Sequence, residues 1–398
     1  MVVALICGGG NGAHCLAGIA SSQPDTEVRV LTLYADEAER WTNLMKDNEF
    51  IINVYVQSKL DQVHKTKPKI VTKDPNAVVP GADIIIFIVP AFAHGQYLQA
   101  IAPHLKPGSV IVGMPGQPGF DFELRSVLGE KASQVTVLNM ESMPWPSRIK
   151  EFGKEADVLG MKNSIRGSIL YGSPRPEKEP QVLLQNLLGK LPQVEVKGHL
   201  LCMTLMGVNA MLHPEIIWAH WESNMTPVDK SPLFYQGADN KAANTISGVS
   251  DEVMNIVKAI NQQRPNVDMS GVQHMFDYFK RVYEDDIKDK TSLLTCLQTN
   301  PGYRGLVHPT RKTEKGQHLP DFSHRYLTED IPYGLAVLRG CAEVVGVPTP
   351  TMDQVLTWCQ TNMGKEYLKD GKTAGKDLGS TRAPQRFGIT TLDQMLGC

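Results

Sequence analysis

The chain begins with the stretch VVALICGGGNGAH, residues 2–14, which decides the fold class. The apolar run before the glycines predicts a strand, and the helical spacing after them predicts a helix. Gly8, Gly10 and Ala13 match the pattern G-x-G-x-x-G/A at this junction. Such glycines let a pyrophosphate approach the backbone, next to the free N–H groups of the helix start. We therefore expect a dinucleotide-binding turn formed by Gly8, Gly10, Asn11, Gly12 and Ala13.

Outward from this turn, strand and helix patterns alternate through the first half of the chain. The expected strands are 27–34, 83–89, 109–113 and 134–140, and an expected helix is 35–45. Two further segments, 157–161 and 168–172, are expected to extend the same sheet. Strands that alternate with helices predict an α/β, Rossmann-like, doubly wound parallel sheet. We assign residues 1–200 to this NAD-binding domain.

The pattern changes near residue 200, where strand signals almost vanish. Segments with helical period are 200–221, with an interruption at Pro214, and 249–263, 272–287 and 331–346. We therefore expect an all-α C-terminal domain over residues 201–398. A division into two domains also suits a chain of 398 residues.

The composition excludes several classes of protein. Forty basic residues against 42 acidic ones give a net charge of −2, which argues against broad electrostatic binding of nucleic acid or membrane. The seven cysteines are widely spaced and form no CxxC pair, which argues against a disulfide framework and a zinc site. The uncharged segment 84–105 is interrupted by prolines and by Gly95, so it predicts a buried strand and a short helix. We expect a cytoplasmic protein with no metal.

Four residues of the first half are further candidates for ligand binding. Asp36 lies 26 residues beyond Gly10, and two interpretations stay open: an acidic ribose partner or a cap of the next helix. Arg40 affects the choice between NAD and NADP, but no basic cluster follows the strand, so we favour NAD(H). Pro90 and Gln117 follow two expected strands at the edge where ligands bind, although each also suits an ordinary turn.

The helical half offers a candidate acid–base group. His213 lies in the apolar stretch MLHPEIIW, where a packed core histidine is the somewhat better interpretation. Arg325, Glu329 and Asp330 gather in DFSHRYLTEDIP, before an expected helix. A guanidinium suits a substrate carboxylate, and a carboxylate beside a histidine fixes its tautomer. Ordinary acidic residues at a helix start account for the same stretch.

Motifs along nearly the whole chain resemble the opine dehydrogenases, in particular the octopine dehydrogenase group of marine invertebrates. They occur in the order CGGGNGAH, VRVLTLYADEAERW, VPAFAH, PWPSRIKEFG, PLFYQG, RGLVHP, RYLTEDIP, GKEYL and TRAPQRFG. The resemblance implies a Rossmann domain, a helical domain and the use of NADH. It also implies reductive condensation of pyruvate with an amino acid through an imine, which regenerates NAD⁺ in anaerobic glycolysis.

The resemblance also implies roles for individual residues. His213 would be the general acid/base, Asp330 would orient and polarise it, and Arg325 would hold the carboxylate of the 2-oxo acid. Gln117 and Ser142 would line the pyruvate side. Two alternatives remain: a 2-hydroxy-acid dehydrogenase that acts without an amine, and a non-catalytic NAD(H)-sensing protein.

The amino partner stays open among taurine, alanine, glycine and arginine. Tyr278 stands where we expect tryptophan in an arginine-specific enzyme, and Lys280 and Arg281 add positive charge. If this segment faces the site, Tyr278 contributes to substrate binding and a small or anionic partner is favoured. A solvated helix face is the commoner explanation of such charges. A monomeric state is left open.

Overall fold

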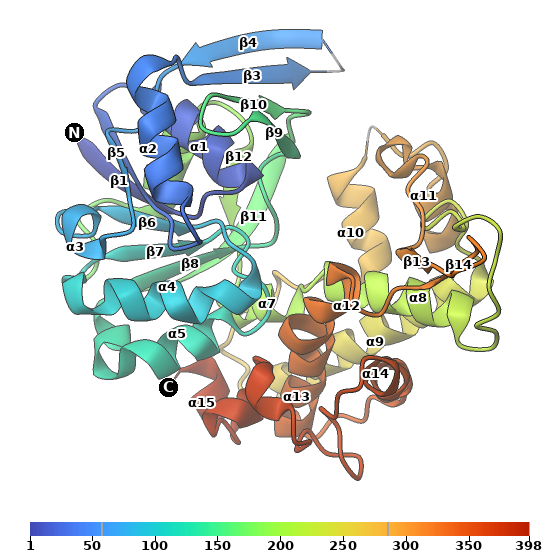
Figure 1. The fold of residues 1–398 in the computed structure, drawn as a ribbon. Helices are drawn as coiled ribbons and strands as arrows, with labels where there is room; N and C mark the ends of the chain where they lie inside the picture. The colour runs from blue at the N-terminus through green and yellow to red at the C-terminus, as the bar shows by residue number, and fades with distance from the viewer. Residues whose placement is uncertain (57–58, 285, 398) are drawn as a thin grey trace. The chain divides into compact units, whose positions relative to one another are not determined.

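The computed structural model describes residues 1–56, 59–284 and 286–397. The chain forms two compact units, Met1–Met203 and Thr204–Cys398 (Figure 1). The boundary expected from the sequence, at residue 200, lies just before this division. Within the described residues, no helix combines the length and the apolar character needed to cross a bilayer.

The first unit is built on an eight-stranded sheet in the order β12-β11-β8-β7-β6-β1-β2-β5. Its strands are β1 (Val2–Cys7), β2 (Thr26–Leu31), β5 (Ile70–Thr72), β6 (Ile84–Phe87), β7 (Val110–Gly113), β8 (Thr136–Met140), β11 (Ser164–Leu170) and β12 (Gln193–Val196). All pairings are parallel except that of β8 with β11. The predicted Rossmann-like sheet is thereby confirmed.

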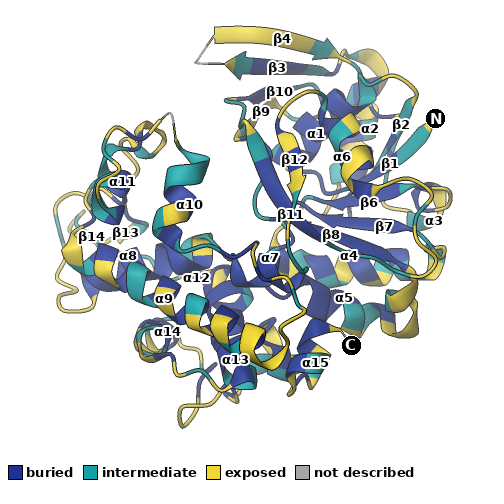
Figure 2. Ribbon diagram, turned by 180° about the vertical axis from the view of Figure 1, so that it is seen from behind, coloured by how far each residue is buried: buried dark blue, intermediate teal, exposed yellow. Residues whose placement is uncertain are grey.

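Helices cover both faces of this sheet, as Figure 1 shows. They are α1 (Asn11–Ser21), α2 (Glu37–Asp47), α3 (Pro75–Val78), α4 (His94–Ile101), α5 (Phe120–Leu128) and α6 (Pro180–Leu188). Along β6, Ile84 and Ile86 pack in one core with α1 and α6, whereas Ile85 and Phe87 pack in the other with α4 and α5. Burial on both faces explains the continuous apolar run of the central strands (Figure 2).

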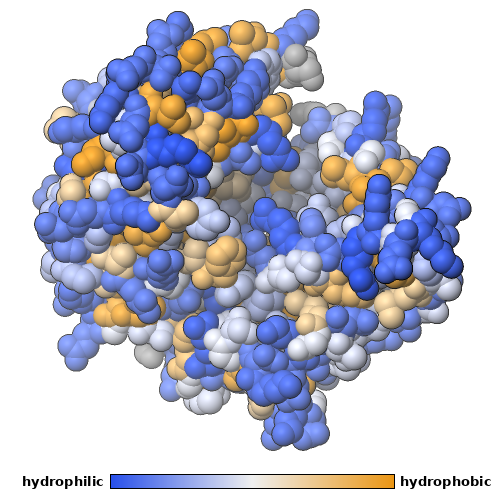
Figure 3. Space-filling model, in the orientation of Figure 1, coloured by the Kyte–Doolittle hydropathy of each residue, from blue (hydrophilic) through white to orange (hydrophobic). Residues whose placement is uncertain are grey.

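A second sheet of four strands, in the order β4-β3-β10-β9, corrects one prediction. Its strands are β3 (Ile51–Val56), β4 (Lys59–Lys65), β9 (Ser147–Glu151) and β10 (Glu155–Val158). The segment 157–161 was expected in the main sheet, but its first residues belong to β10, where Asp157 pairs with Asn53 of β3. Both side chains of this polar pair are buried, and their hydrogen bond joins the two central strands of the smaller sheet. Apolar residues lie exposed among hydrophilic ones over the β3–β4 end, including Leu60 and Val63 (Figure 3).

The second unit is mainly helical, as predicted. Its helices are α7 (Leu201–Leu205), α8 (His213–Trp221), α9 (Asn240–Gln263), α10 (Met275–Val282), α11 (Leu293–Thr299), α12 (Arg325–Thr328), α13 (Ala336–Val345), α14 (Pro350–Asn362) and α15 (Leu392–Leu396). One short pair of strands, β13 (Thr310–Lys312) and β14 (His318–Pro320), accompanies them. The expected interruption of the stretch 200–221 is present, but it lies before Pro214. α7 ends at Leu205 and α8 begins at His213, with Pro214 in its first turn, where no N–H donor is needed.

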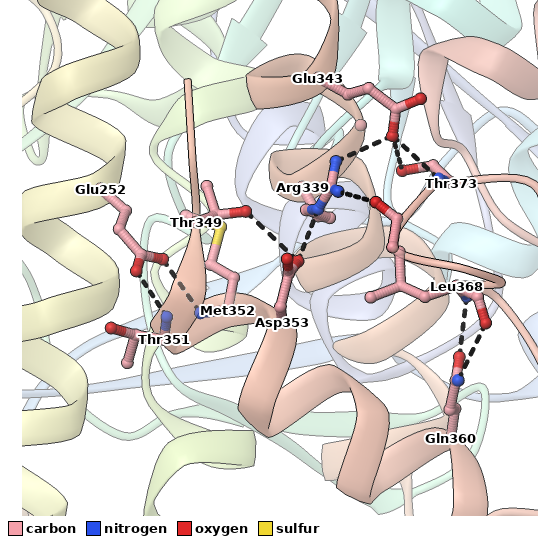
Figure 4. A network of polar contacts seen from close by, with 12 residues as sticks. Glu252, Arg339, Glu343, Thr349, Thr351, Met352, Asp353, Gln360, Leu368 and Thr373 are labelled. Atoms are coloured by element: carbon pink, nitrogen blue, oxygen red, sulfur yellow. Dashed lines mark hydrogen bonds and ion pairs between the residues drawn. The ribbon is translucent and has the colours of Figure 1, made fainter. Parts of the chain in front are cut away.

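A polar network fixes three helices of this unit against one another (Figure 4). Arg339 of α13 donates to Asp353 of α14 at 2.6 Å and to Glu343 at 2.8 Å. The Glu252 carboxylate of α9 accepts hydrogen bonds from the N–H groups of Thr351 and Met352 at the start of α14. This carboxylate therefore satisfies helix donors that lack an intrahelical partner.

Candidate active site

The glycine turn after β1 has the geometry that a dinucleotide pyrophosphate requires. Gly8 adopts φ +131°, and a Cβ atom there would lie 2.4 Å from the carbonyl oxygen of Ile88. Gly10 is the N-cap of α1, and a Cβ atom at Gly10 would meet nothing within 4 Å. Because Gly10 has no side chain, it leaves the first N–H groups of α1 to a negatively charged ligand. The turn therefore fits a bound NAD(H).

The small residues of the first helical turn allow α1 to pack closely on the sheet. A Cβ atom at Gly12 would lie 2.4 Å from the Cε atom of Met143. Ala13 is completely buried. A larger side chain at either position would move the helix start away from the place where the phosphates bind.

Two polar residues of the motif hold the turn in place. The His14 ring stacks on Trp41 with 3.7 Å between centroids, and its Nε2 accepts the N–H of Gly153 at 3.0 Å. Burial lowers the pKa of His14 to about 4, so this ring is neutral. The Asn11 side chain accepts the N–H of Ile149 in β9 at 2.9 Å. Although Asn11 was predicted to bind the cofactor, its carbonyl oxygen makes this contact within the protein.

The acidic residues after β2 take different positions. Asp36 is exposed at the N-cap of α2, but its side chain makes no capping bond to the described residues. Glu37, which the sequence reasoning missed, accepts the Thr32 hydroxyl at 2.6 Å. A Cβ atom at Gly9 would lie 2.2 Å from the Glu37 carboxylate, so this carboxylate lies against the glycine turn. The guanidinium of Arg40 lies over the ring of Phe152, 4.0 Å from its centroid.

The other candidates of the first unit lie beyond neighbouring strands. Pro90 is exposed after β6, and Gln117 and Ser142 are half-buried after β7 and β8. Because β1, β6, β7 and β8 are parallel, these residues lie at the edge that carries the glycine turn. Gln117 adopts φ +65°, a strained conformation for a residue with a side chain. Lys162, which was not predicted, donates to the Ser142 hydroxyl at 2.8 Å.

In the second unit, the structure brings His213 and Asp330 together across 117 positions of sequence. The Nδ1 atom of His213 lies 2.7 Å from the Asp330 carboxylate. The Nε2 atom lies 2.7 Å from the hydroxyl of Tyr235. The imidazole also stacks on the ring of Tyr326, with 3.8 Å between centroids. All three polar members of this group are buried, so water competes weakly for their hydrogen bonds.

Local structure explains how this pair forms. His213 begins α8, so its side chain lies at the helix start, and Pro214 fixes the backbone beside it. Asp330 follows α12, and its carbonyl oxygen accepts the N–H of Leu335 at 2.8 Å, which starts the next helical segment. A carboxylate that accepts Nδ1–H leaves Nε2 as the nitrogen that exchanges protons.

Arg325 and its neighbours provide charge beside this pair. Arg325 begins α12, its side chain is 69% exposed, and it forms an ion pair with Glu329 at 3.2 Å. It adjoins Tyr326, whose ring lies on His213. An exposed guanidinium one residue from a ring in contact with His213 can bind an incoming carboxylate.

Tyr278 lies on α10 and reaches the His213 group through other rings. It is buried and contacts Phe279, which meets Tyr303, and Tyr303 stacks on Tyr235 with 3.9 Å between centroids. These ring contacts connect Tyr278 to the group around His213.

The sequence reasoning missed several residues around His213. Tyr235 lies in PLFYQG, and Tyr326 lies in RYLTEDIP, so both belong to the motifs that carried the resemblance. Glu215 is fully buried two residues after His213, and burial raises its pKa well above 4.5. Within the described ranges, no group of three or more His, Cys, Asp or Glu side chains is placed to hold a metal ion.

Known proteins resemble this chain over its whole length. The family model described as NAD/NADP octopine/nopaline dehydrogenase, alpha-helical domain, matches residues 196–363. A tauropine dehydrogenase of Arabella iricolor is 54% identical over 398 residues, which is 100% of both chains. A solved octopine dehydrogenase with NADH and L-arginine is 42% identical, has a TM-score of 0.95, and is matched over 100% of this chain and 98% of that one.

The complex of octopine dehydrogenase with NADH and pyruvate is also 42% identical, with a TM-score of 0.93 and the same coverage. Identity of this extent exceeds what a shared fold alone produces. The resemblance read from the motifs is therefore confirmed: the chain belongs to the opine dehydrogenase family of NAD-dependent oxidoreductases that act on CH–NH groups.

Proposed function

We propose that the chain catalyses the NADH-dependent reductive condensation of pyruvate with taurine, which forms tauropine, NAD⁺ and water. The group of His213, Asp330 and Arg325 is the observation that carries the reaction type, because it supplies a proton-transfer nitrogen, its orienting carboxylate and a site for an anion. The solved octopine dehydrogenase complexes, with NADH and pyruvate or with NADH and L-arginine, support the two kinds of substrate.

His213 moves protons in this reaction. Its neutral Nε2 takes a proton from the taurine ammonium, so that the amine can attack the carbonyl carbon of pyruvate. The resulting imidazolium then gives this proton to the carbinolamine hydroxyl, which leaves as water and produces the protonated imine. Asp330 stabilises the imidazolium and keeps Nδ1–H directed toward its carboxylate. Bound NADH would supply the hydride that reduces the imine carbon.

Arg325 binds the pyruvate carboxylate, and Gln117 and Ser142 complete the pyruvate side. The exposed guanidinium of Arg325 supports the first role, and the strained backbone of Gln117 supports the second, since such strain clusters at functional sites. We further propose Glu37, in addition to Asp36, as a partner of the adenine ribose. Its carboxylate lies against the glycine turn and would repel a 2′-phosphate, which favours NAD over NADP.

Taurine is favoured over arginine by the charges of α10. Arg281 donates to Gln273 at 2.8 Å and lies 5.5 Å from the centroid of the Tyr278 ring. Lys280 forms an ion pair with Asp277 at 2.7 Å. α10 contacts the His213 group through the rings of Phe279 and Tyr303. A guanidinium on this helix would attract the sulfonate of taurine and repel the side chain of arginine.

A kinetic comparison of amines tests this proposal. NADH oxidation is followed with pyruvate and, in turn, taurine, alanine, glycine, β-alanine and arginine. We expect the highest kcat/KM with taurine and the lowest with arginine. Replacing Arg281 with Gln should raise KM for taurine about tenfold and leave KM for glycine within about twofold. The matched replacement Lys258→Gln, on α9, should change neither. A preference for arginine in the wild type would contradict the assignment.

We also propose a cytoplasmic monomer. The six cysteines of the described chain are buried and form no disulfide with one another, which suits a reducing compartment. The His213 group is complete within one chain, so the site needs no second copy. Light scattering at assay concentration tests the monomer, and a mass of twice 43.9 kDa would contradict it.

A further inference from the structure

The hydroxyl of Tyr235 lies at the atom of His213 where the reaction takes place. The distance from this hydroxyl to Nε2 is 2.7 Å, equal to that between Nδ1 and Asp330. Both nitrogens of the ring therefore have a hydrogen-bond partner in the protein. The proposed chemistry uses one of these partners, Asp330, and leaves the other without a role.

The contacts determine which atom donates in each of the two hydrogen bonds of the His213 ring. Asp330 accepts, so Nδ1 carries the hydrogen and Nε2 of the neutral ring has a lone pair. The Tyr235 O–H then donates to Nε2. When His213 is protonated, Nε2–H donates instead, and the same oxygen accepts. A hydroxyl can fill both roles by rotation about its C–O bond, whereas an ammonium group or a carboxylate can fill only one.

Packing holds the Tyr235 hydroxyl in this place. Its ring stacks on that of Tyr303, with 3.9 Å between the centroids and an angle of 15° between the planes, and Tyr235 is only 5% exposed. The preceding residue, Phe234, donates its N–H to the carbonyl oxygen of Leu306 at 2.8 Å. Burial raises the pKa of Tyr235 well above its ordinary value, so the phenol keeps its proton throughout the working range.

We propose that Tyr235 is a positioning residue for proton transfer, whose hydroxyl holds Nε2 of His213 in both protonation states and yields this nitrogen to the substrate. This inference rests on the proposed function. It predicts a ring that is fixed at both nitrogens before substrate binds. Without the hydroxyl, the imidazole would be held at Nδ1 and by its stacking on Tyr326 alone.

Other charged and titratable groups surround the ring and contribute to its titration. They are Asp330 in contact, Tyr326 on the ring face, Glu215 on α8, and His324, Arg325 and Glu329 on or beside α12. Tyr235→Phe should leave the charged groups among them in place, and it also removes the hydrogen bond between the Tyr235 and Tyr326 hydroxyls. A change in the pH profile of that variant is then due to the lost hydroxyl.

The test is Tyr235→Phe, which keeps the ring and removes only the hydroxyl. We expect kcat for tauropine formation to fall about tenfold, with KM for pyruvate and Kd for NADH within about twofold. The hydrogen bond from the imidazolium is the stronger of the two, so its loss disfavours protonated His213. Tauropine oxidation needs neutral His213 as the base, so its activity should extend to lower pH in the variant.

Tyr303→Phe is the matched control. It removes a hydroxyl 3.5 Å from that of Tyr283 and keeps the ring that stacks on Tyr235. It should show the kcat and the pH profile of the wild type. Equal profiles for Tyr235→Phe and the wild type would overturn the inference.

A second readout separates this inference from the proposed function. Histidine ¹⁵N NMR of the protein without substrate, assigned with His213→Gln, reports the tautomer and the titration midpoint of His213 whatever the amine. We expect the Nδ1–H tautomer in the wild type and a lower midpoint in Tyr235→Phe. If taurine is not a substrate but this midpoint moves, the amine assignment fails and the inference stands. An unchanged midpoint overturns the inference even when taurine is turned over.

Discussion

At the residue scale, the short contact between His213 and Asp330 is the feature on which catalysis depends. Replacing Asp330 with Asn removes the charge that stabilises the imidazolium but keeps nearly the same shape. We expect kcat to fall about 100-fold, because a neutral amide does not favour the required tautomer. NADH binding, measured by fluorescence, should change by less than twofold. Asp321→Asn, at a half-buried residue in the segment before α12, is the control and should retain activity. Full activity of Asp330→Asn would exclude this role.

Glu215 gives a second prediction at this scale. It is fully buried, and neither carboxylate oxygen has a hydrogen-bond partner among the described residues. Burial raises its pKa well above 4.5, so the folded protein retains a proton that the unfolded chain releases. The free energy of unfolding therefore falls as pH rises above about 4.5.

Glu215→Gln removes this dependence because glutamine is neutral at every pH. We expect a higher Tm than the wild type at pH 8, by a margin that shrinks as the pH approaches 4. Glu222→Gln, beyond the exposed end of α8, removes a carboxylate paired with Lys241 and should give no such gain at pH 8. Scanning calorimetry at several pH values measures both. A constant difference across pH would refute a buried neutral acid at Glu215.

At the element scale, two glycines of the turn between β1 and α1 have different roles: Gly10 affects cofactor binding, and Gly8 affects the stability of the fold. Gly10 has an ordinary φ of −86° and open space at its Cβ position, so Gly10→Ala should keep the wild-type Tm. The added methyl group occupies the approach of the phosphates, so Kd for NADH should rise about tenfold.

Gly8→Ala should behave differently, because φ +131° and the carbonyl oxygen of Ile88 leave no room for a methyl group. We expect Tm to fall by several degrees in this variant. Calorimetry measures Tm, and NADH titration measures Kd, for both the Gly10→Ala and the Gly8→Ala variant. The reverse pattern, with Gly10→Ala unstable and Gly8→Ala normal, would show that the turn differs from this description.

The periodicity of the sequence predicted the strands that are buried on both faces, but it did not predict the edge strands or the second sheet. The central strand β6 is apolar without interruption, so the sequence identified it. β4 is a largely exposed, charged strand, and β12 has two exposed residues among its four. Neither of these two strands shows a strong apolar pattern. β10 was assigned to the wrong sheet because period alone does not specify the strand partner.

At the scale of the whole molecule, the sequence predicted which residues share a site in the first unit better than it did in the second. In the first unit the candidates follow parallel strands, so topology alone predicts that they share one edge. In the second unit His213 and Asp330 come from segments 117 positions apart in the chain, and spacing alone could not predict their contact. The resemblance supplied that pair, whereas the contact of Tyr235 with Nε2 became evident only from the structure.

The central claim is that the amine nitrogen enters the product, and the fate of labelled taurine tests it most directly. The protein is supplied with pyruvate, NADH and ¹⁵N-taurine, and products are identified by mass spectrometry while NADH is followed by absorbance. We predict one ¹⁵N-containing secondary amine for each NADH oxidised, and no oxidation with pyruvate alone. Lactate as the product, formed at the same rate without taurine, would contradict the account and leave a 2-hydroxy-acid dehydrogenase.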